Sequence, residues 1–423
     1  MKRRGFLALG AVLGVSACHG GTGGSAKSIT YWSNWKQGEG QQKVIARAIT
    51  DFTAETGIDV DVQWQGRTVP QKLVPALNTN KVPDIVDGSF AKLAPVLVET
   101  KQGADLSSAY QEKVDDSTVN DLISEQYRQE LTARGEHPWM LPYLVSSDAI
   151  WFDRSTHPEL AKNPPTTWDE FVKTLKAAKS SGKTPLAADG DIAGYNAFWF
   201  TTLYLRETGP GGFAKLAQDK SGALWESKEA LSASQKVEQL VNGGYFIDGY
   251  TASKWPAQQQ AWATGKAELL FNGSWIPTET GTYATKDFSY ASFPFPYLKN
   301  DHTTAARADF TGFAIPQKSK KQKEAGRLAA FLLRKKYQDL IGTDAKSIPV
   351  RDDASTPTEQ ASVVKALRNA KEVYQQNDGV TFSGYLEKTF WPLDDELFLG
   401  KINAQQFVTK MKAAQVAYWK ANG

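Results

Sequence analysis

The chain contains very little cysteine and histidine. Its 423 residues include one cysteine, Cys18, and four histidines. A disulfide needs two cysteines, and zinc fingers and iron–sulfur proteins need several Cys or His ligands. The sequence therefore excludes these classes of protein, and we expect neither a metal site nor a cofactor.

The chain also has no large excess of either charge. Its 49 Lys and Arg residues exceed its 46 Asp and Glu residues by three, and Lys2, Arg3 and Arg4 account for that difference. Without them the basic and acidic residues balance. Because binding to a phosphate backbone requires a basic surface, we expect no nucleic-acid partner.

No apolar run is long enough for a transmembrane helix, which needs about 20 residues. The most apolar stretch, Phe6–Val15, follows a basic start and precedes small residues. This order is typical of a secretory signal peptide, which we expect over residues 1–17. Arg3-Arg4 followed by Gly-Phe-Leu also partly resembles a twin-arginine export signal.

Cys18 directly follows Val15-Ser16-Ala17. This arrangement resembles the bacterial lipobox, in which the cysteine is acylated and becomes the first mature residue. The alternative is an incidental cysteine in an apolar segment. We expect Cys18 to be lipidated and residues 18–28 to include a flexible Gly- and Ser-rich tether. The protein would then be exported and held by lipid at the outer face of the cytoplasmic membrane.

Strands and helices alternate along the rest of the chain. The pattern predicts strands over 28–32, 58–64 and 82–86, with helices over 41–56 and about 70–77 between them. This order implies a parallel sheet with helices on its faces, and therefore an α/β fold. Later segments repeat the alternation, with strands over 149–152 and 269–271 and a helix opened by the capping box Thr167-Trp168-Asp169-Glu170.

Three segments are candidates for crossings between two lobes, namely 143–147, 298–303 and 349–353. We therefore divide the chain into an N-terminal lobe, 29–144 plus 302–351, and a C-terminal lobe, 145–301 plus 352–423.

Several predicted strands end in polar and aromatic residues. Ser33-Asn34-Trp35-Lys36 follows the first strand, Asp87-Gly88-Ser89 the third, and Asn272-Gly273-Ser274-Trp275 a later one. In open α/β sheets ligands bind at the carboxyl ends of strands. A sugar needs polar partners for its hydroxyls and a flat ring for its C–H face. The alternative for any one of the 13 Trp residues is core packing, which we expect for more than half of them.

The most specific segments are 263–275, 164–171 and 82–86, together with Phe390-Trp391 ahead of the late helices. With these segments and the N-terminal anchor, residues 28–423 resemble the extracellular solute-binding proteins of carbohydrate ABC importers. The resemblance implies the two-lobed type II periplasmic-binding-protein fold, in which lobes built on mostly parallel sheets close on a ligand about a hinge. It also implies a monomer that delivers a neutral di- or oligosaccharide to membrane permease subunits.

The resemblance implies stacking roles for Trp275 and Trp391, and a second-lobe aromatic at Trp199. Ser146 stands where maltose-binding proteins of the family have a ligand-contacting Glu, which argues against maltose itself. The full set of expected ligand-binding residues is Asn34, Trp35, Lys36, Asp87, Ser89, Ser146, Trp199, Asn272, Trp275, Asp309, Gly312, Arg351 and Trp391.

Three other functions stay open from the residues alone. A secreted glycoside hydrolase would use two carboxylates, which the acidic clusters 115–116, 352–353 and 394–396 could supply. Such runs are more often helix starts or solvated faces, so we expect no enzyme. The second is a binding protein for a non-sugar molecule such as a polyol, and the third is a surface adhesion module.

Overall fold

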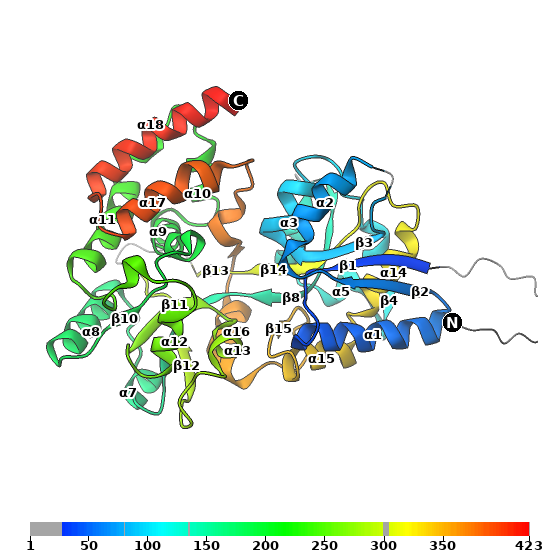
Figure 1. Ribbon diagram of the computed structural model, residues 1–423, viewed down its shortest axis with the longest axis horizontal. Coiled ribbons are helices and arrows are strands. Elements are labelled where there is room, and N and C mark those ends of the chain that lie inside the picture. Colours follow the sequence, from blue (N-terminus) through cyan, green and yellow to red (C-terminus); the bar gives the residue numbers. More distant parts are fainter. Residues whose placement is uncertain (1–27, 80, 134–135, 299–303, 423) are drawn as a thin grey trace, which may run out of the picture.

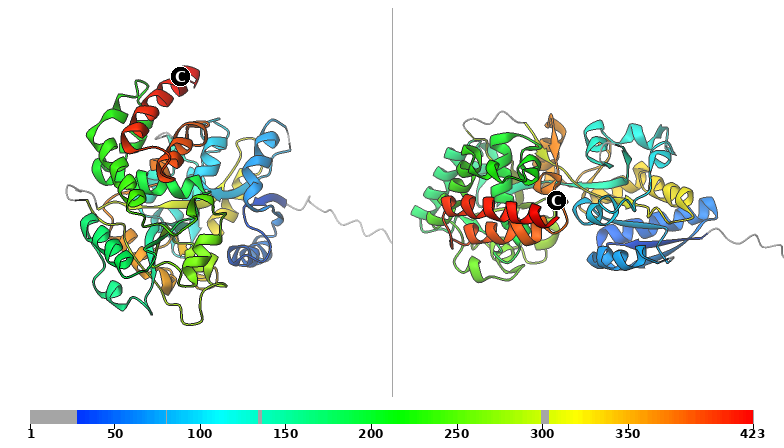
Figure 2. Two further views of the ribbon diagram at one scale, coloured as in Figure 1. Left: turned by 60° about the vertical axis from the view of Figure 1, so that its left-hand side comes forward. Right: turned by 90° about the horizontal axis from the view of Figure 1, so that it is seen from above.

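The computed structural model describes residues 28–422 except 80, 134–135 and 299–303. The expected signal peptide, Cys18 and nearly all of the tether lie outside the described residues. Two groups of elements lie side by side, one blue to yellow and the other green to red (Figure 1, Figure 2). Each is built around its own sheet, and we call them the first and second lobes.

The first lobe contains a six-stranded sheet in the order β15-β8-β14-β3-β1-β2. β1 pairs in parallel with β2 and β3, which confirms the parallel arrangement expected for the first strands. β14 runs antiparallel to β3 and β8, and β15 antiparallel to β8. The strands are β1 (Ser28–Ser33), β2 (Asp59–Trp64), β3 (Ile85–Ser89), β8 (Met140–Ser146), β14 (Asp309–Ala314) and β15 (Ile348–Pro349).

β3 begins three residues later than the sequence pattern predicts. Pro83 has no N–H to donate to a neighbouring strand. Asp84 uses its carboxylate to accept from the backbone N–H of Thr30, at 2.9 Å. The pairing of β3 with β1 therefore starts at Ile85. This shift carries the end of the strand to Ser89, so Asp87 lies within the sheet.

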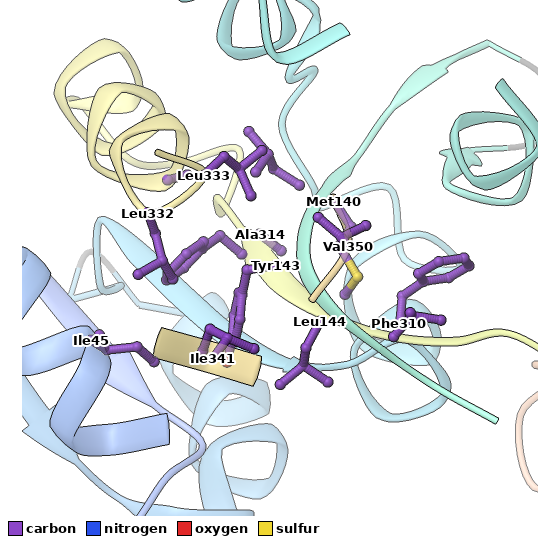
Figure 3. Packing of buried hydrophobic residues seen from close by; sticks show 14 of the residues in the cluster. Ile45, Met140, Tyr143, Leu144, Phe310, Ala314, Leu332, Leu333, Ile341 and Val350 are labelled. Carbon is purple, nitrogen blue, oxygen red and sulfur yellow. The ribbon is translucent and has the colours of Figure 1, made fainter. Parts of the chain in front are cut away.

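Helices cover both faces of this sheet. α1 (Gly40–Thr56) buries side chains at helical spacing and ends at Gly57, whose φ of 67° favours glycine. Figure 3 shows Tyr143 of β8 beside Ala314 of β14 and Ile341 of α15. The other elements of this lobe are η1 (Gly66–Thr68), α2 (Val69–Leu77), α3 (Phe90–Leu97), α4 (Ser107–Tyr110), β4 (Lys113–Val114), β5 (Ser117–Thr118), α5 (Val119–Leu122), α6 (Glu125–Glu130), β6 (Thr132–Ala133), β7 (His137–Pro138), α14 (Gln322–Phe331) and α15 (Lys335–Thr343).

The second lobe contains a four-stranded sheet in the order β10-β11-β9-β12. β10 (Leu186–Ala187) is parallel to β11 (Leu269–Gly273). β9 (Asp148–Asp153) is antiparallel to both β11 and β12 (Tyr290–Phe293), so the other three strands share one direction. α8 (Trp168–Ser180) begins with the expected capping box, in which Thr167 and Glu170 bind each other's backbone N–H.

Aromatic rings fill much of the second lobe's core, including Phe200, Trp225, Phe390 and Phe407. The remaining elements of this lobe are α7 (Pro158–Lys162), α9 (Ala193–Thr208), α10 (Gly212–Gln218), η2 (Ala223–Glu226), α11 (Lys228–Asn242), η3 (Tyr250–Ala252), α12 (Ala257–Ala263), α13 (Ile276–Thr280), η5 (Gln376–Gly379), η6 (Leu386–Phe390), α17 (Trp391–Phe398) and α18 (Ala404–Asn422). α11 and α17 pack against α9, and α18 packs on the outside against α11 and α17 (Figure 1).

The chain passes between the two sheets at short segments. Ser147 separates β8 from β9, and Ala308 separates β13 (Ala306–Arg307) from β14. β13 pairs with β16 (Val373–Tyr374) in a two-stranded ladder. η4 (Thr358–Gln360) and α16 (Ala361–Asn369) follow β15 and contact β12 of the second lobe. Within the described part of the chain, no helix combines the length and apolarity needed to span a bilayer.

Candidate functional site

At the carboxyl edge of the second sheet, the expected ligand-binding residue Trp275 lies on the same side as a group of acidic residues. Because β10 and β11 are parallel, the segments that follow them leave the sheet at the same edge. Trp275 comes two residues after β11, and Asp189–Asp191 follows β10. This edge therefore combines a tryptophan with carboxylates.

Trp275 and Trp391 both lie next to the first turn of α9. Tyr195, in the first turn of α9, stacks on Trp275 with ring centroids 5.9 Å apart and planes 27° apart. A Cβ on the neighbouring Gly194 would lie 3.8 Å from Cζ2 of Trp391. Gln376 donates from Nε2 to the carbonyl of Gly194, at 3.4 Å. The start of α9 thus lies between the two tryptophans, which we call the aromatic pair.

Both indole nitrogens of the aromatic pair are buried. The Trp391 N–H has no hydrogen-bond acceptor among the described residues, whereas the Trp275 N–H faces the hydroxyl of Tyr195, where it opposes the rise in pKa that burial causes. The two rings themselves stay partly exposed. A buried donor without an acceptor costs about 1–3 kcal/mol. Native proteins rarely leave such a group unsatisfied, except where a ligand or water completes it. The aromatic pair therefore offers two partly exposed rings and one unused donor, on Trp391, to a polar ligand with apolar faces.

Carboxylates lie beside Trp275. Glu279, one helical turn along the chain, accepts from Nε2 of the buried Gln259 at 3.0 Å. Burial raises the pKa of Glu279, while the hydrogen bond from Gln259 and the positive charge of Arg67 oppose that rise. Arg67 belongs to the first lobe, so a first-lobe cation acts on this second-lobe carboxylate.

The first lobe contributes the loop after β1. Trp35 is buried, and its indole N–H donates to the hydroxyl of Tyr143 at 2.6 Å. The guanidinium of Arg67 lies 4.4 Å from the centroid of the Trp35 ring. Trp35 therefore packs under the loop after β1 and stabilises it. Its neighbour Lys36 has an exposed side chain.

Asp87 and Asn34 are held together beneath the surface. The buried Asp87 carboxylate accepts from the backbone N–H of Asn34 at 2.6 Å and from the hydroxyl of Tyr143. Burial raises the pKa of Asp87, and these hydrogen bonds partly offset the rise. These two residues position the loop, and Asp87 has no exposed surface with which to contact a ligand.

Arg67 and Lys92, two first-lobe cations at this edge, lay outside the sequence prediction, whereas Ser89 was an expected site residue. Ser89 precedes α3, and Lys92 lies in the first turn of that helix with an exposed side chain. Burial of the ammonium group, together with the charge of Arg67, lowers the pKa of Lys92. Lys36, Arg67 and Lys92 lie at the carboxyl edge of the first sheet, where Glu39 pairs with Arg67 at 3.0 Å and offsets part of their positive charge.

Four expected site residues lie elsewhere in the structure. Trp199 is 2% exposed and contacts Phe246, Phe271 and Phe295, so it belongs to the core. Tyr195, one helical turn earlier at the start of α9, is the residue of this helix that contacts Trp275. One turn, about 5.4 Å, separates the sheet edge from the core here.

The other three are explained by packing or pairing. A Cβ on Gly312 would approach the Leu141 carbonyl oxygen to 2.6 Å, so the sheet accepts only glycine there. Arg351 is buried and forms ion pairs with Asp115 and Asp353. Asn272 is buried and accepts from the N–H of Gly273. Their described contacts are internal to the protein.

Ser146 and Asp309 lie at the lobe crossings. Arg307 forms ion pairs with Asp309 and with Asp148, which begins β9. The Asp309 carboxylate also accepts from the backbone N–H of Gln376, at 2.6 Å. Burial lowers the pKa of the Arg307 guanidinium. The negative charges of Asp309 and Asp148 have the larger effect, so the pKa is raised overall. Asp309 therefore joins the crossing segments to one another.

In the acidic cluster 394–396, Asp395 and Glu396 have internal partners, whereas one carboxylate oxygen of Asp394 has no hydrogen-bond partner among the described residues. Asp394 is buried, and burial raises its pKa well above the usual value. Asp395 accepts from Asn196, and Glu396 pairs with Lys410. Among the described residues, no three His, Cys, Asp or Glu side chains are grouped as a metal site.

A separate cavity of about 230 Å³ lies in the first lobe. Its walls include Tyr110, Asn120 and Arg128, none of which was an expected site residue. Nη1 of Arg128 already donates to the backbone carbonyls of Asn120 and Ile123. This cavity is therefore distinct from the aromatic pair.

The chain is similar to known proteins in both sequence and fold. The sequence pattern of the bacterial extracellular solute-binding proteins matches residues 33–339. The multiple sugar-binding protein of Streptococcus mutans serotype c is 24% identical over 228 residues, which cover 52% of this chain and 54% of that protein. The diacetylchitobiose binding protein NgcE of Streptomyces coelicolor is 22% identical over 272 residues, covering 62% and 57%. The chain thus spans little more than half the length of these relatives.

Solved structures share the fold. The binding protein RafE in complex with raffinose has a TM-score of 0.72 at 18% identity, covering 92% of this chain and 99% of that one. The solute receptor AcbH, described as having an exclusive preference for β-D-galactopyranose, has a TM-score of 0.75 at 17% identity, covering 94% and 100%. The two-lobed fold expected from the sequence is confirmed.

Proposed function

Because the chain belongs to the bacterial extracellular solute-binding proteins, we propose that it binds a neutral di- or oligosaccharide between its lobes and delivers it to an ABC permease. The observation that carries this proposal is the aromatic pair, whose two partly exposed rings flank the start of α9 and whose Trp391 indole N–H lacks an acceptor among the described residues. Aromatic faces suit the C–H faces of a sugar, and one of its hydroxyls can accept from the Trp391 indole.

The names of the relatives support the class of ligand. Two of them are described as binding multiple sugars and diacetylchitobiose. A linear polyol has no rigid apolar face that could cover an indole ring. The aromatic pair therefore favours a cyclic sugar over a polyol.

The cations and carboxylates at the two sheet edges support closure about the hinge. Lys36, Arg67 and Lys92 lie on the first lobe, and Asp189 and Glu279 on the second. Opposite charges on the two edges favour their approach. The sugar must contact both lobes to favour the closed state, because a ligand with equal affinity for both states shifts nothing.

Export, lipidation at Cys18 and membrane anchoring belong to the same proposal, as do a monomeric state and the absence of catalysis. A lipid-anchored binding protein stays close to its permease after releasing its ligand. The division into lobes of 29–144 plus 302–351 and of 145–301 plus 352–423 also remains a prediction.

A thermal-shift screen of the mature chain tests the proposal. The panel contains maltose, raffinose, stachyose, xylo-oligosaccharides and chito-oligosaccharides, with sorbitol and mannitol as polyols. We expect one oligosaccharide series to raise the Tm, since a ligand at 100 times its Kd adds about 2.7 kcal/mol.

The same mixtures are then analysed by chromatography. Unchanged sugars are expected, whereas cleavage products would support a hydrolase. A Tm that rises only with polyols, or with no compound, would contradict the proposed sugar ligand.

A further inference from the structure

Trp255 differs from every other tryptophan in the chain. All 13 tryptophans lie in the described residues, and Trp255 alone is exposed, at 45%. Single exposed apolar side chains are common and need no explanation by themselves. The position of Trp255 and the anchoring of its backbone make it informative.

The backbone around Trp255 is fixed by three consecutive residues. Its N–H donates to Oδ1 of Asp191 at 2.8 Å. The Asp189 carboxylate accepts from the N–H groups of Gln258 and Gln259, at 2.9 and 3.2 Å. The N–H of Gly190 donates to Oγ of Ser253, at 3.2 Å. An exposed ring on an anchored backbone loses little entropy when it binds, which favours its use as a contact surface.

Residues 189–191 also place Trp255 at the carboxyl edge of the second sheet, where Trp275 lies. Asp189–Asp191 follows β10, whose parallel neighbour β11 leads to Trp275. Gln259, next to the Asp189 contact, binds Glu279 in the helix that begins directly after Trp275. Trp255 therefore lies on the same edge as the aromatic pair, farther out toward solvent.

We propose that Trp255 forms an outer subsite of the sugar site, where its ring stacks on a further sugar unit of a bound oligosaccharide. The Asp191 carboxylate, partly exposed beside it, accepts hydrogen bonds from that unit's hydroxyls. This inference rests on the proposed function and narrows it. The ligand is a neutral oligosaccharide that extends beyond the ring held by Trp275, and a disaccharide leaves Trp255 uncovered.

Calorimetric titrations of the mature chain test the subsite. The probes are xylo-, malto- and chito-oligosaccharides from disaccharide to hexasaccharide, with raffinose and stachyose. The variants are W255A, W255Y and W275A, and W419A is the control on the outer helix α18.

We expect W255A to weaken binding of the longer members of the bound series about five- to tenfold, the lower end of the range for loss of one stacked ring, because Trp255 is partly exposed to solvent. Its affinity for the shortest bound member should be unchanged. W255Y should keep most of the affinity, W419A should match wild type, and W275A should weaken binding at every length.

The outcomes separate the two proposals. Equal affinities of W255A and wild type at every length, with W275A impaired, would overturn the outer subsite and leave the proposed function standing. Equal losses of W255A at all lengths would also overturn it, because the ring would then act on the whole site. Failure of wild type to bind any probe would overturn the proposed function and the subsite with it.

Discussion

Tyr195 stacks on Trp275 with ring centroids 5.9 Å apart, and this contact joins the first turn of α9 to the residue that follows β11. The two residues are 80 positions apart in the sequence. Gly194, in the same turn, lies next to Trp391, so this turn contacts both tryptophans of the aromatic pair. The orientation of both indoles therefore depends on a short stretch of α9.

Replacement of Tyr195 tests this dependence. We expect Y195A to weaken sugar affinity about five- to tenfold, because Trp275 loses the ring that holds it. Y195F keeps the stacked ring and should bind within about twofold of wild type. Calorimetric titration measures both, with Y418A on α18 as the control. Equal affinities of Y195A and wild type would show that Trp275 is positioned without Tyr195.

Trp199 should behave as a core residue. We expect W199A to lower the free energy of unfolding by about 3–5 kcal/mol, the usual cost of removing a large buried ring. Urea denaturation without ligand measures the loss. At a temperature where W199A is folded, its sugar affinity should stay near that of wild type. A normal stability combined with lost binding would return Trp199 to the site.

Arg307 should be essential where the lobes meet. R307M leaves the buried Asp148 and the partly buried Asp309 without their cation, and removing one partner of a buried ion pair costs about 3–5 kcal/mol. We expect this loss in urea denaturation. Adding D148N and D309N to R307M should restore part of the stability, since no uncompensated charge then remains. A triple variant less stable than R307M would contradict this electrostatic explanation.

Glu130 should make stability depend on pH. Burial raises its pKa from 4.5 to about 7, opposed by a hydrogen bond from Gln375 and supported by the charge of Asp378. The folded state thus binds this proton more tightly than the unfolded state. Its favourable contribution is complete below pH 4.5 and is lost as the pH rises through about 7.

The matched variant is E130Q, which carries no titrating proton at this position. The free energy of unfolding of wild type should fall between pH 4.5 and 7 more steeply than that of E130Q. Urea denaturation at a series of pH values measures the difference. Parallel curves for the two proteins would show that Glu130 titrates normally.

Local patterns predicted much of the fold because they have local causes. The capping box at Thr167 and the stop at Gly57 both form as expected. The start of β3 was misplaced because it depends on a contact between Asp84 and Thr30. No periodicity in residues 82–86 reveals a partner that lies more than 50 positions away.

The site was predicted in part for the same reason. Trp275 and Trp391 lie at the ends of elements, where their rings stay partly exposed, and their role as ligand-binding residues remains a prediction. In the segment around Trp199, Tyr195 contacts Trp275 whereas Trp199 is buried in the core, and the sequence alone does not show how deep each side chain lies. Tyr195 could have been found by counting back one turn to the start of α9. The exposure of Trp255 and the charge of Arg67 on Glu279 arise only from tertiary contacts.

A crystal structure of the mature chain with its best-binding oligosaccharide tests the central claim most directly. We predict a sugar ring in van der Waals contact with Trp275 and Trp391, with a sugar oxygen accepting from the Trp391 indole N–H. The lobes should both contact the ligand. A sugar bound elsewhere, such as in the 230 Å³ cavity beside Arg128, with the two indoles uncovered, would contradict the account.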